Sequence, residues 1–302
     1  MSILVVGSVA LDTVETPFGA VADALGGSAT YFSIAASLYA NVSLVAVVGT
    51  DFSDRHVAVL RGRGVDLAGL QVDEGKTFRW AGKYDYDLNS AHTLDTQLNV
   101  FATFHPTLPA AYRSSPFLFL ANIDPDLQYE VLQQVGDARL KVMDTMNFWI
   151  EGKRESLTRT MGAVDVVLMN EAEVREYAQT YNLSLAARRI LALGPKALIV
   201  KKGEYGCVMF SESGYFVAPA YPLEEVKDPT GAGDSFAGGF IGCLARAGEV
   251  TPALVRRAII HGCVVASFAV EDFSVERLLT VTPDDIDRRY REFLEFTCFD
   301  EV

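Results

Sequence analysis

Residues 228–239 read DPTGAGDSFAGG, and this stretch is the strongest local signal in the chain. Its small residues Gly231, Ala232 and Gly233 lead directly into a segment, 234–247, that is predicted to be helical. The first turn of a helix exposes unpaired N–H groups and the positive end of the helix dipole. Small side chains let a phosphate approach those groups. The stretch therefore predicts an anion-binding turn.

An acidic residue, Asp234, stands at this turn, where a carboxylate should repel a phosphate. Its place is explained if Asp234 accepts a proton from a substrate hydroxyl while the neighbouring N–H groups hold a phosphoryl group. The alternative is that Asp234 only caps the helix, because Asp is common at helix starts. The local sequence leaves both explanations open.

Two other glycine motifs are excluded. A P-loop requires Gly-x-x-x-x-Gly-Lys-Ser/Thr, but Gly233 and Gly238 are followed by Gly239 and Phe240. A dinucleotide fingerprint requires a third glycine where Phe236 stands. The turn therefore predicts phosphate binding without NAD binding, and a dehydrogenase on a similar α/β scaffold is excluded.

The composition predicts a soluble, cytoplasmic protein. Of 302 residues, 50% are hydrophobic and 22% charged, so the chain can bury a large core with little disorder. A formal net charge of −13 argues against nucleic-acid or anionic-membrane partners, because affinity for them comes from Lys and Arg. We expect no signal peptide and no membrane span. The four cysteines are scattered, which favours reduced, mostly buried thiols.

Short apolar runs alternate with longer amphipathic ones, which indicates strands alternating with helices. Several of the strands are apolar throughout, as is typical of a parallel sheet covered on both faces. We therefore expect an α/β fold with a doubly wound, mostly parallel central sheet. The predicted strands are 3–6, 44–48, 117–121, 140–144, 164–169, 197–201, 207–210 and 215–217. The predicted helices are 30–39, 54–63, 126–135, 171–181, 185–193, 234–247, 252–269 and 283–296.

One region departs from this rhythm. In residues 77–86 and 97–104, apolar and polar residues alternate one by one, and aromatic side chains are frequent. A polar segment lies between the two stretches. We interpret them as a β-hairpin, joined by residues near 12–18, that forms a small lid outside the main sheet. An ordinary hairpin at the edge of the main sheet is the alternative.

Together with other motifs, the glycine stretch resembles the PfkB, ribokinase-like family of carbohydrate and nucleoside kinases. The family pattern Asp-x-x-Gly-Ala-Gly-Asp is met by residues 228–234, and Asn-x-x-Glu by Asn170 and Glu173. Asp12 with Gly26-Gly27, and the run 202–206, match further family positions. The matches cover nearly the whole chain. The resemblance implies a single ribokinase-like domain over 1–302, a three-layer sandwich with a small β lid.

The resemblance also implies roles for the glycine turn and for the nucleotide. Asp234 would be the general base, and Gly231, Ala232 and Gly233 would form an anion hole for the transferring phosphoryl group. ATP and Mg²⁺ are the implied cofactors. The implied nucleotide contacts are Lys202, Gly203, Gly206, Thr230 and His261. A lone histidine is more often structural, which is the alternative for His261.

The implied metal contacts are Asn170, Glu173 and Asp228. Asn170 and Glu173 would steer Mg²⁺ through its water shell, since Mg²⁺ sheds water reluctantly. Without the family context, these two residues would read as a helix N-cap and a first-turn acid. Asp228 and Thr230 match part of a monovalent-cation site, so potassium dependence is an open alternative.

Asp12, Gly26 and Gly27 match positions that hold the acceptor's hydroxyls. The family asparagine four residues after the Gly-Gly pair is replaced by Tyr31, which is bulkier and lacks the paired geometry of an amide. This exchange predicts a changed acceptor, so ribokinase or fructokinase activity does not follow. Further acceptor candidates, with loop chemistry as the alternative for each, are Asn99, Asn122 and Asp124.

The sequence therefore predicts an ATP-dependent kinase that phosphorylates a hydroxyl of a small sugar or sugar derivative. A nucleoside kinase on the same scaffold is the alternative, slightly favoured by the lid aromatics Phe78, Trp80, Tyr84 and Tyr86. Those aromatics would otherwise form the packing surface of a homodimer, which family members with this lid often form. A non-catalytic regulator is disfavoured because the expected catalytic motifs are all present.

Overall fold

The computed structural model describes residues 1–298, and its main sheet confirms the predicted α/β architecture. Nine strands follow the order β13-β12-β11-β10-β9-β8-β1-β4-β5. All neighbouring pairs from β11 to β5 are parallel, whereas β12 and β13 run antiparallel at one edge. The strands are β1 Ser2–Val6, β4 Asn41–Gly49, β5 Asp66–Asp73, β8 Phe117–Leu120, β9 Leu140–Asp144, β10 Val166–Asn170, β11 Ala197–Lys201, β12 Cys207–Ser211 and β13 Gly214–Ala218.

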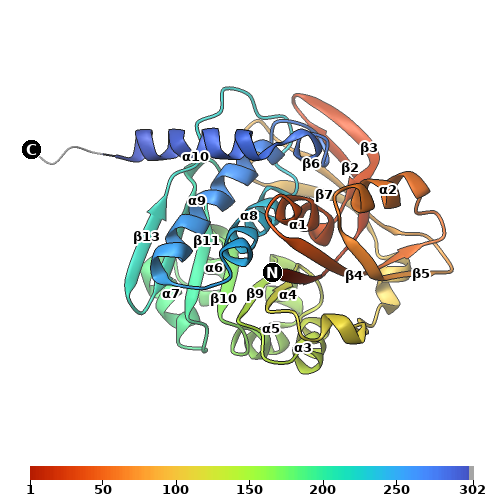
Figure 1. The fold of residues 1–302 in the computed structure, drawn as a ribbon, viewed down its shortest axis with the longest axis horizontal. Helices are drawn as coiled ribbons and strands as arrows, with labels where there is room; N and C mark the ends of the chain where they lie inside the picture. The colour runs from red at the N-terminus through yellow and green to blue at the C-terminus, as the bar shows by residue number, and fades with distance from the viewer. Residues whose placement is uncertain (299–302) are drawn as a thin grey trace, which may run out of the picture.

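Helices cover both faces of this sheet (Figure 1). Alternate residues of β1 show the two faces: Ile3 and Val5 belong to one buried cluster, and Leu4 and Val6 to the other. The first cluster includes side chains of α1, α2, α8, α9 and α10, and the second includes those of α3 to α7. The helices are α1 Ser28–Ser37, α2 Asp54–Gly62, α3 Pro125–Gln134, α4 Asn147–Gly152, α5 Arg154–Met161, α6 Glu171–Ala178, α7 Leu183–Leu191, α8 Ala232–Ala247, α9 Pro252–Ala269 and α10 Pro283–Thr297.

Glycines let α8 pack closely between α1 and α9, which lie beside it in Figure 1. A Cβ at Gly238 would lie 2.6 Å from the Cβ of Ala35 and 2.8 Å from the carbonyl oxygen of Phe32 in α1. A Cβ at Gly239 would lie 2.7 Å from the carbonyl oxygen of His261 in α9. Contacts this short do not occur with a real side chain, so glycine at these two positions sets the helix spacing.

A second sheet of four strands, here called the small sheet, has the order β3-β2-β6-β7. Its strands are β2 Ala10–Thr16, β3 Gly19–Gly26, β6 Phe78–Tyr84 and β7 Ala91–Gln97. The expected strand at 97–104 is wrong: residues Asn99–Thr103 form a 3-10 turn, with Val100 and Phe104 buried. The expected polar link is in fact mostly β7, an edge strand whose seven residues are all exposed and so lack the apolar alternation of a half-buried strand.

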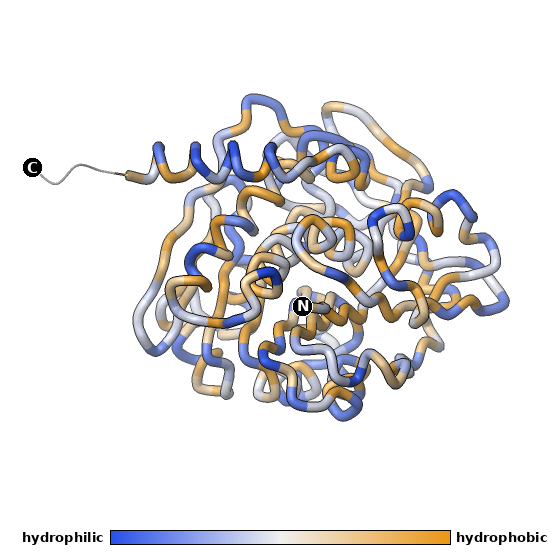
Figure 2. The backbone as a smooth tube through the Cα atoms, viewed as in Figure 1, coloured by the Kyte–Doolittle hydropathy of each residue, from blue (hydrophilic) through white to orange (hydrophobic). Residues whose placement is uncertain are grey.

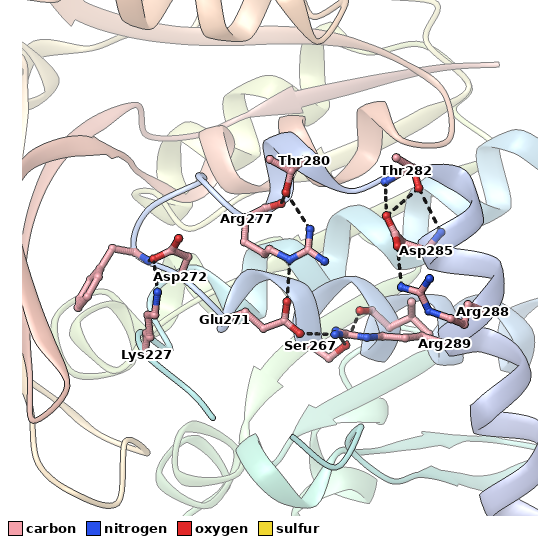
Figure 3. Close-up of polar contacts among 12 residues, drawn as sticks. Lys227, Ser267, Glu271, Asp272, Arg277, Thr280, Thr282, Asp285, Arg288 and Arg289 are labelled. Atoms are coloured by element: carbon pink, nitrogen blue, oxygen red, sulfur yellow. Dashed lines mark hydrogen bonds and ion pairs between the residues drawn. The ribbon is translucent and has the colours of Figure 1, made fainter. Parts of the chain in front are cut away.

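Long-range contacts fasten the small sheet to the main body. Thr16 Oγ1 donates to the Lys227 carbonyl at 2.9 Å, and Ser274 Oγ donates to the Leu25 carbonyl at 2.5 Å. The loop that carries Ser274 follows α9 and is itself held by ion pairs from Glu271 to Arg277 and Arg289 (Figure 3). This loop therefore connects the small sheet to α10 and lies beside the segment that precedes the glycine turn.

Hydropathy along the backbone follows this arrangement, with apolar residues concentrated on the central strands and on α8 and α9 (Figure 2). Contrary to expectation, α9 is long and apolar enough to span a membrane by length and composition. It packs against α8 and α10, and 56% of its apolar window is buried, so a core helix explains its composition. All four cysteines are free, and all but Cys298 are buried, as predicted.

We predict that Gly238→Ala lowers the free energy of unfolding by about 1–3 kcal/mol, because the added methyl overlaps α1. Chemical denaturation measures the change. Gly62→Ala is the matched control: Gly62 also lies in a helix, but a Cβ there would have no neighbour within 4 Å among the described residues outside its own stretch of helix. That variant should be unchanged or stabilised by up to about 1 kcal/mol. Equal stability of both variants would contradict the proposed packing constraint.

Candidate active site

The glycine turn starts α8, and its backbone explains its composition. Gly231, the N-cap residue, has φ 74°, a conformation that favours glycine. A Cβ there would also overlap the ring of Tyr31. Among the described residues, no backbone carbonyl accepts a hydrogen bond from the N–H of Gly233. The first turn of α8 therefore offers a free donor at the positive end of the helix dipole.

Asp234 lies in this first turn and is partly buried. Burial raises the pKa of Asp234 to about 8, with a further upward contribution from Asp144 and an opposing one from Lys201. A carboxylate with a raised pKa is a stronger base than an exposed one. In its ionised form, which the Lys201 ammonium favours, the side chain is a strong enough base to accept a proton from a hydroxyl.

Asp12, on β2 of the small sheet, lies in a tight cradle formed by the Gly-Gly pair. A Cβ at Gly26 would overlap its carboxylate, and the N–H of Gly27 donates to Asp12 Oδ2 at 3.3 Å. Gly27 has φ 92°, and a Cβ there would lie 2.6 Å from the Ser8 carbonyl oxygen. Burial raises the pKa of Asp12 to about 7, although the Gly27 N–H opposes the shift. Both glycines are thus required by local geometry.

Tyr31, on α1, connects the Gly-Gly pair to the glycine turn. The residue is 2% exposed, and its ring lies against Gly231. Burial raises the pKa of its phenol, and the negative charges of Asp12, Asp228 and Asp234 raise it further. The phenol is therefore protonated and available as a hydrogen-bond donor among three carboxylates.

Asp228 precedes the glycine turn and is 1% exposed. Its Oδ1 accepts a hydrogen bond from the N–H of Thr230 at 2.8 Å, and Thr230 Oγ1 donates to the hydroxyl of Tyr84 at 3.2 Å. Within the described residues, Asp228 Oδ2 has no hydrogen-bond partner. Burial raises the pKa of Asp228. A buried carboxylate oxygen without a donor suits a bound cation.

Asn170 and Glu173 form a capping box at the start of α6. Asn170 Oδ1 accepts from the N–H of Glu173 at 2.8 Å, and the Glu173 carboxylate accepts from the backbone and side-chain nitrogens of Asn170, each at 2.7 Å. Burial raises the pKa of Glu173 to about 7. The described residues contain no group of three His, Cys, Asp or Glu side chains placed to hold a metal. The pair therefore suits contact with a hydrated ion, not direct coordination.

The run 202–206 forms a tight turn between β11 and β12. Gly203 and Gly206 have φ values of 56° and 84°, and the Gly206 carbonyl accepts from the N–H of Lys202 at 2.8 Å. A Cβ at Gly203 would lie 2.6 Å from the side-chain oxygen of Asn89. Because Asn89 belongs to the link between β6 and β7, the tip of the small sheet reaches over this turn.

His261 does not join the site. Its ring is 1% exposed, stacks on Tyr290 with centroids 4.7 Å apart, and accepts or donates a hydrogen bond at 3.2 Å to the hydroxyl of Tyr39. Burial lowers the pKa of His261 to about 3, so the ring is neutral. The enclosure of this side chain in the structure argues against the expected nucleotide contact.

The other acceptor candidates have structural partners. Asn99 Nδ2 donates to the Thr77 carbonyl at 2.9 Å, which fixes the turn after β7. Asp124 caps α3 and pairs with Lys153 at 2.6 Å, so its carboxylate is already satisfied. Asn122 accepts from Trp149 Nε1 at 3.0 Å, and its carbonyl accepts from Ser28, next to the Gly-Gly pair. Of these three, Asn122 is the one linked to the described site.

Sequence reasoning missed Lys201, the last residue of β11. Its Nζ lies 2.5 Å from Asp144 Oδ2 and would lie 2.9 Å from a Cβ at Gly233. A lysine at a strand end resembles an ordinary solvated charge. The available signal was its place at the carboxyl end of a parallel strand, where ligands of doubly wound sheets collect.

A family model and two known proteins match most of this chain. The family model for pfkB carbohydrate kinases matches residues 3–280. A cytidine kinase of Thermococcus kodakarensis is 29% identical over 251 residues, covering 82% of this chain and 89% of that protein. An inositol 3-kinase of Arabidopsis thaliana is 24% identical over 302 residues, covering 96% of this chain and 81% of that protein.

A solved structure shares the fold. The aminoimidazole riboside kinase of Salmonella enterica, in complex with aminoimidazole riboside and an ATP analog, has a TM-score of 0.75 at 20% identity. The match covers 96% of this chain and 100% of that one. The match supports the three-layer, ribokinase-like architecture.

We predict that Asp234→Asn stabilises the ligand-free protein more at pH 8 than at pH 5. The folded-state pKa of about 8 exceeds the ordinary value of 3.8, so folding favours the protonated carboxyl. Its contribution to stability is therefore complete below about pH 4 and is lost as the pH rises through 8. Asparagine removes this loss. Thermal unfolding at both pH values measures the gain in stability, and Asp73→Asn, at an exposed position, is the control. An equal gain for Asp234→Asn at pH 5 and pH 8 would contradict the raised pKa of Asp234.

Proposed function

Because the chain belongs to the pfkB family of carbohydrate kinases, we propose that it transfers the γ-phosphate of ATP to a hydroxyl of a small sugar or sugar derivative. Members of this family are phosphotransferases with an alcohol group as acceptor. The observation that carries the proposal is the position of Asp234, a basic carboxylate beside the free N–H of Gly233. Phosphoryl transfer needs such alignment and charge stabilisation more than covalent chemistry.

In the proposed reaction, the acceptor hydroxyl loses its proton to Asp234 as its oxygen attacks the γ-phosphorus. The N–H groups of the glycine turn receive the charge of the transferring group. Asn170 and Glu173 would contact the water shell of Mg²⁺ bound with ATP, and this ion would neutralise phosphate charge. Lys202, Gly203 and Gly206 would border the nucleotide, because their turn lies at the same sheet edge as Asn170.

The acceptor would lie between the small sheet and the glycine turn, near Asp12, Tyr31 and Asn122. Within this class of acceptor, a nucleoside is favoured by Trp80. Trp80 pairs in register with Asp12 on β2 and lies on the same face of β6 as Tyr84, whose hydroxyl meets Thr230. An indole at this place can stack on a base. The relative that is a cytidine kinase supports the same choice.

A homodimer through the small sheet stays a prediction. The edge strand β7 is exposed along its whole length, as such an interface would require. A soluble, cytoplasmic location likewise stays a prediction from composition.

We predict that Asp234→Asn lowers turnover by about 10²–10⁴-fold while nucleotide affinity is kept. The measurement is ADP release with Mg-ATP and a panel of nucleosides, sugars, sugar acids and cyclitols. One acceptor that gives stoichiometric transfer in the wild type and none in the variant supports the proposal and identifies the acceptor class. Near-normal turnover of the variant would remove the role given to Asp234.

We predict that K⁺ raises turnover several-fold over choline at equal ionic strength. The unpaired Asp228 Oδ2 supplies the reason, because a monovalent cation would satisfy a buried carboxylate oxygen. Asp228→Asn should lose most of the response to K⁺. An identical rate in K⁺ and in choline would show that this oxygen binds no activating cation.

A further inference from the structure

Lys201 occupies an unusual place at the carboxyl edge of the main sheet. Its partner Asp144 ends β9, and β10 lies between β9 and β11. Neighbouring strands are about 4.8 Å apart, so the lysine side chain must extend across the end of β10 to reach that carboxylate. The ion pair therefore lies over the strand ends, directly beneath the glycine turn.

The surroundings of Lys201 keep it charged. Burial alone would lower the pKa of Lys201, but the carboxylates of Asp144 and Glu173 outweigh burial and the pKa is raised. The side chain is 19% exposed and that of Asp144 is 4% exposed. A protonated ammonium with some remaining exposure keeps donors free for a ligand, because one carboxylate oxygen uses only one of its three N–H groups.

The ammonium group of Lys201 lies next to the glycine turn. Nζ would lie 2.9 Å from a Cβ at Gly233, the residue whose N–H is also free among the described residues. Glycine at 233 thus leaves the ammonium next to the first turn of α8. The first turn of α8 thus has two donors near each other, the Gly233 N–H and Lys201 Nζ, and Lys201 is also close enough to Asp234 to lower its pKa.

We propose that Lys201 binds the transferring phosphoryl group and that Asp144 positions it for this contact. The inference rests on the proposed kinase function and adds a catalytic residue to it. The bond between the γ-phosphorus and the β–γ bridging oxygen breaks, and a bond from the acceptor oxygen to phosphorus forms. The acceptor proton goes to Asp234, and ADP leaves with the bridging oxygen. Lys201 keeps its protons throughout.

The proposed role of Lys201 would reduce the repulsion between the phosphates of ATP and the acidic residues of this site. The phosphates of ATP must approach Asp234, Asp144 and Glu173 in a protein of formal net charge −13. A fixed ammonium in a partly dry site is worth more than one in water. Anchoring by Asp144 also limits the rotamer freedom that a lysine would otherwise lose on binding.

The test is Lys201→Met, with binding of a non-hydrolysable ATP analogue and of ADP measured by calorimetry alongside turnover. Loss of a charge-assisted contact should lower the affinity for the ATP analogue about tenfold or more. The affinity for ADP should stay within about threefold of the wild-type value. Turnover should fall about 10²–10³-fold with the acceptor KM little changed. Lys196→Met is the matched control, because Lys196 pairs with Asp165 at 2.7 Å beside the opposite end of β11.

Folded Lys201→Met protein that binds both nucleotides as the wild type does and turns over normally would overturn the proposal. If this variant does not fold, Asp144→Asn carries the test, because it keeps the lysine and removes its anchor. Turnover and affinity for the ATP analogue should both fall in that variant, as in Lys201→Met. An unchanged enzyme would overturn the proposal. A wild type without kinase activity would refute the proposed function, whereas the ratio of analogue to ADP affinity would still test Lys201.

Discussion

The close approach of α8 to its neighbours is the constraint on which the rest of this structure depends. Glycines at 238 and 239 let α1 and α9 pack against α8. The same helix begins at Gly231, whose missing side chain admits the ring of Tyr31. The same helix therefore serves packing and chemistry. The glycines that set its distance from α1 and α9 also fix the position of the unpaired N–H groups in its first turn.

Acidic side chains gather around the first turn of this helix. Asp12, Glu173 and Asp234 each have a raised pKa because burial disfavours their charged forms. Such carboxylates are costly to keep unless cations or donors meet them. The chain supplies a cation at the edge of the main sheet, Lys201, and leaves one oxygen of Asp228 without a donor among the described residues. The proposed metal-bound nucleotide would bring further cations to these carboxyl groups.

The sequence predicted the parallel sheet well, because strands buried on both faces carry unbroken apolar runs, as at 140–144 and 197–201. It missed β5 and β3, where polar residues or Gly and Ala interrupt such runs. The glycine turn was recognisable from local chemistry. The burial of His261 and the reach of Lys201 were not, since a single residue on a helix or at a strand end does not reveal which elements will surround it.

The order of assembly follows from where the site residues lie in the chain. Asp12 is made near the beginning, and Asp234 after three-quarters of the chain, yet both belong to one site. The first strand, Ser2–Val6, also takes a central place between β4 and β8. During synthesis, the Asp12 carboxyl and the part of β1 that packs against α8 lack the neighbours that α8 supplies until residues 232–247 have been made. Both strand neighbours of β1 are complete by residue 120, whereas the cover from α8 comes late, so a nascent chain exposes part of this apolar surface to chaperones until then.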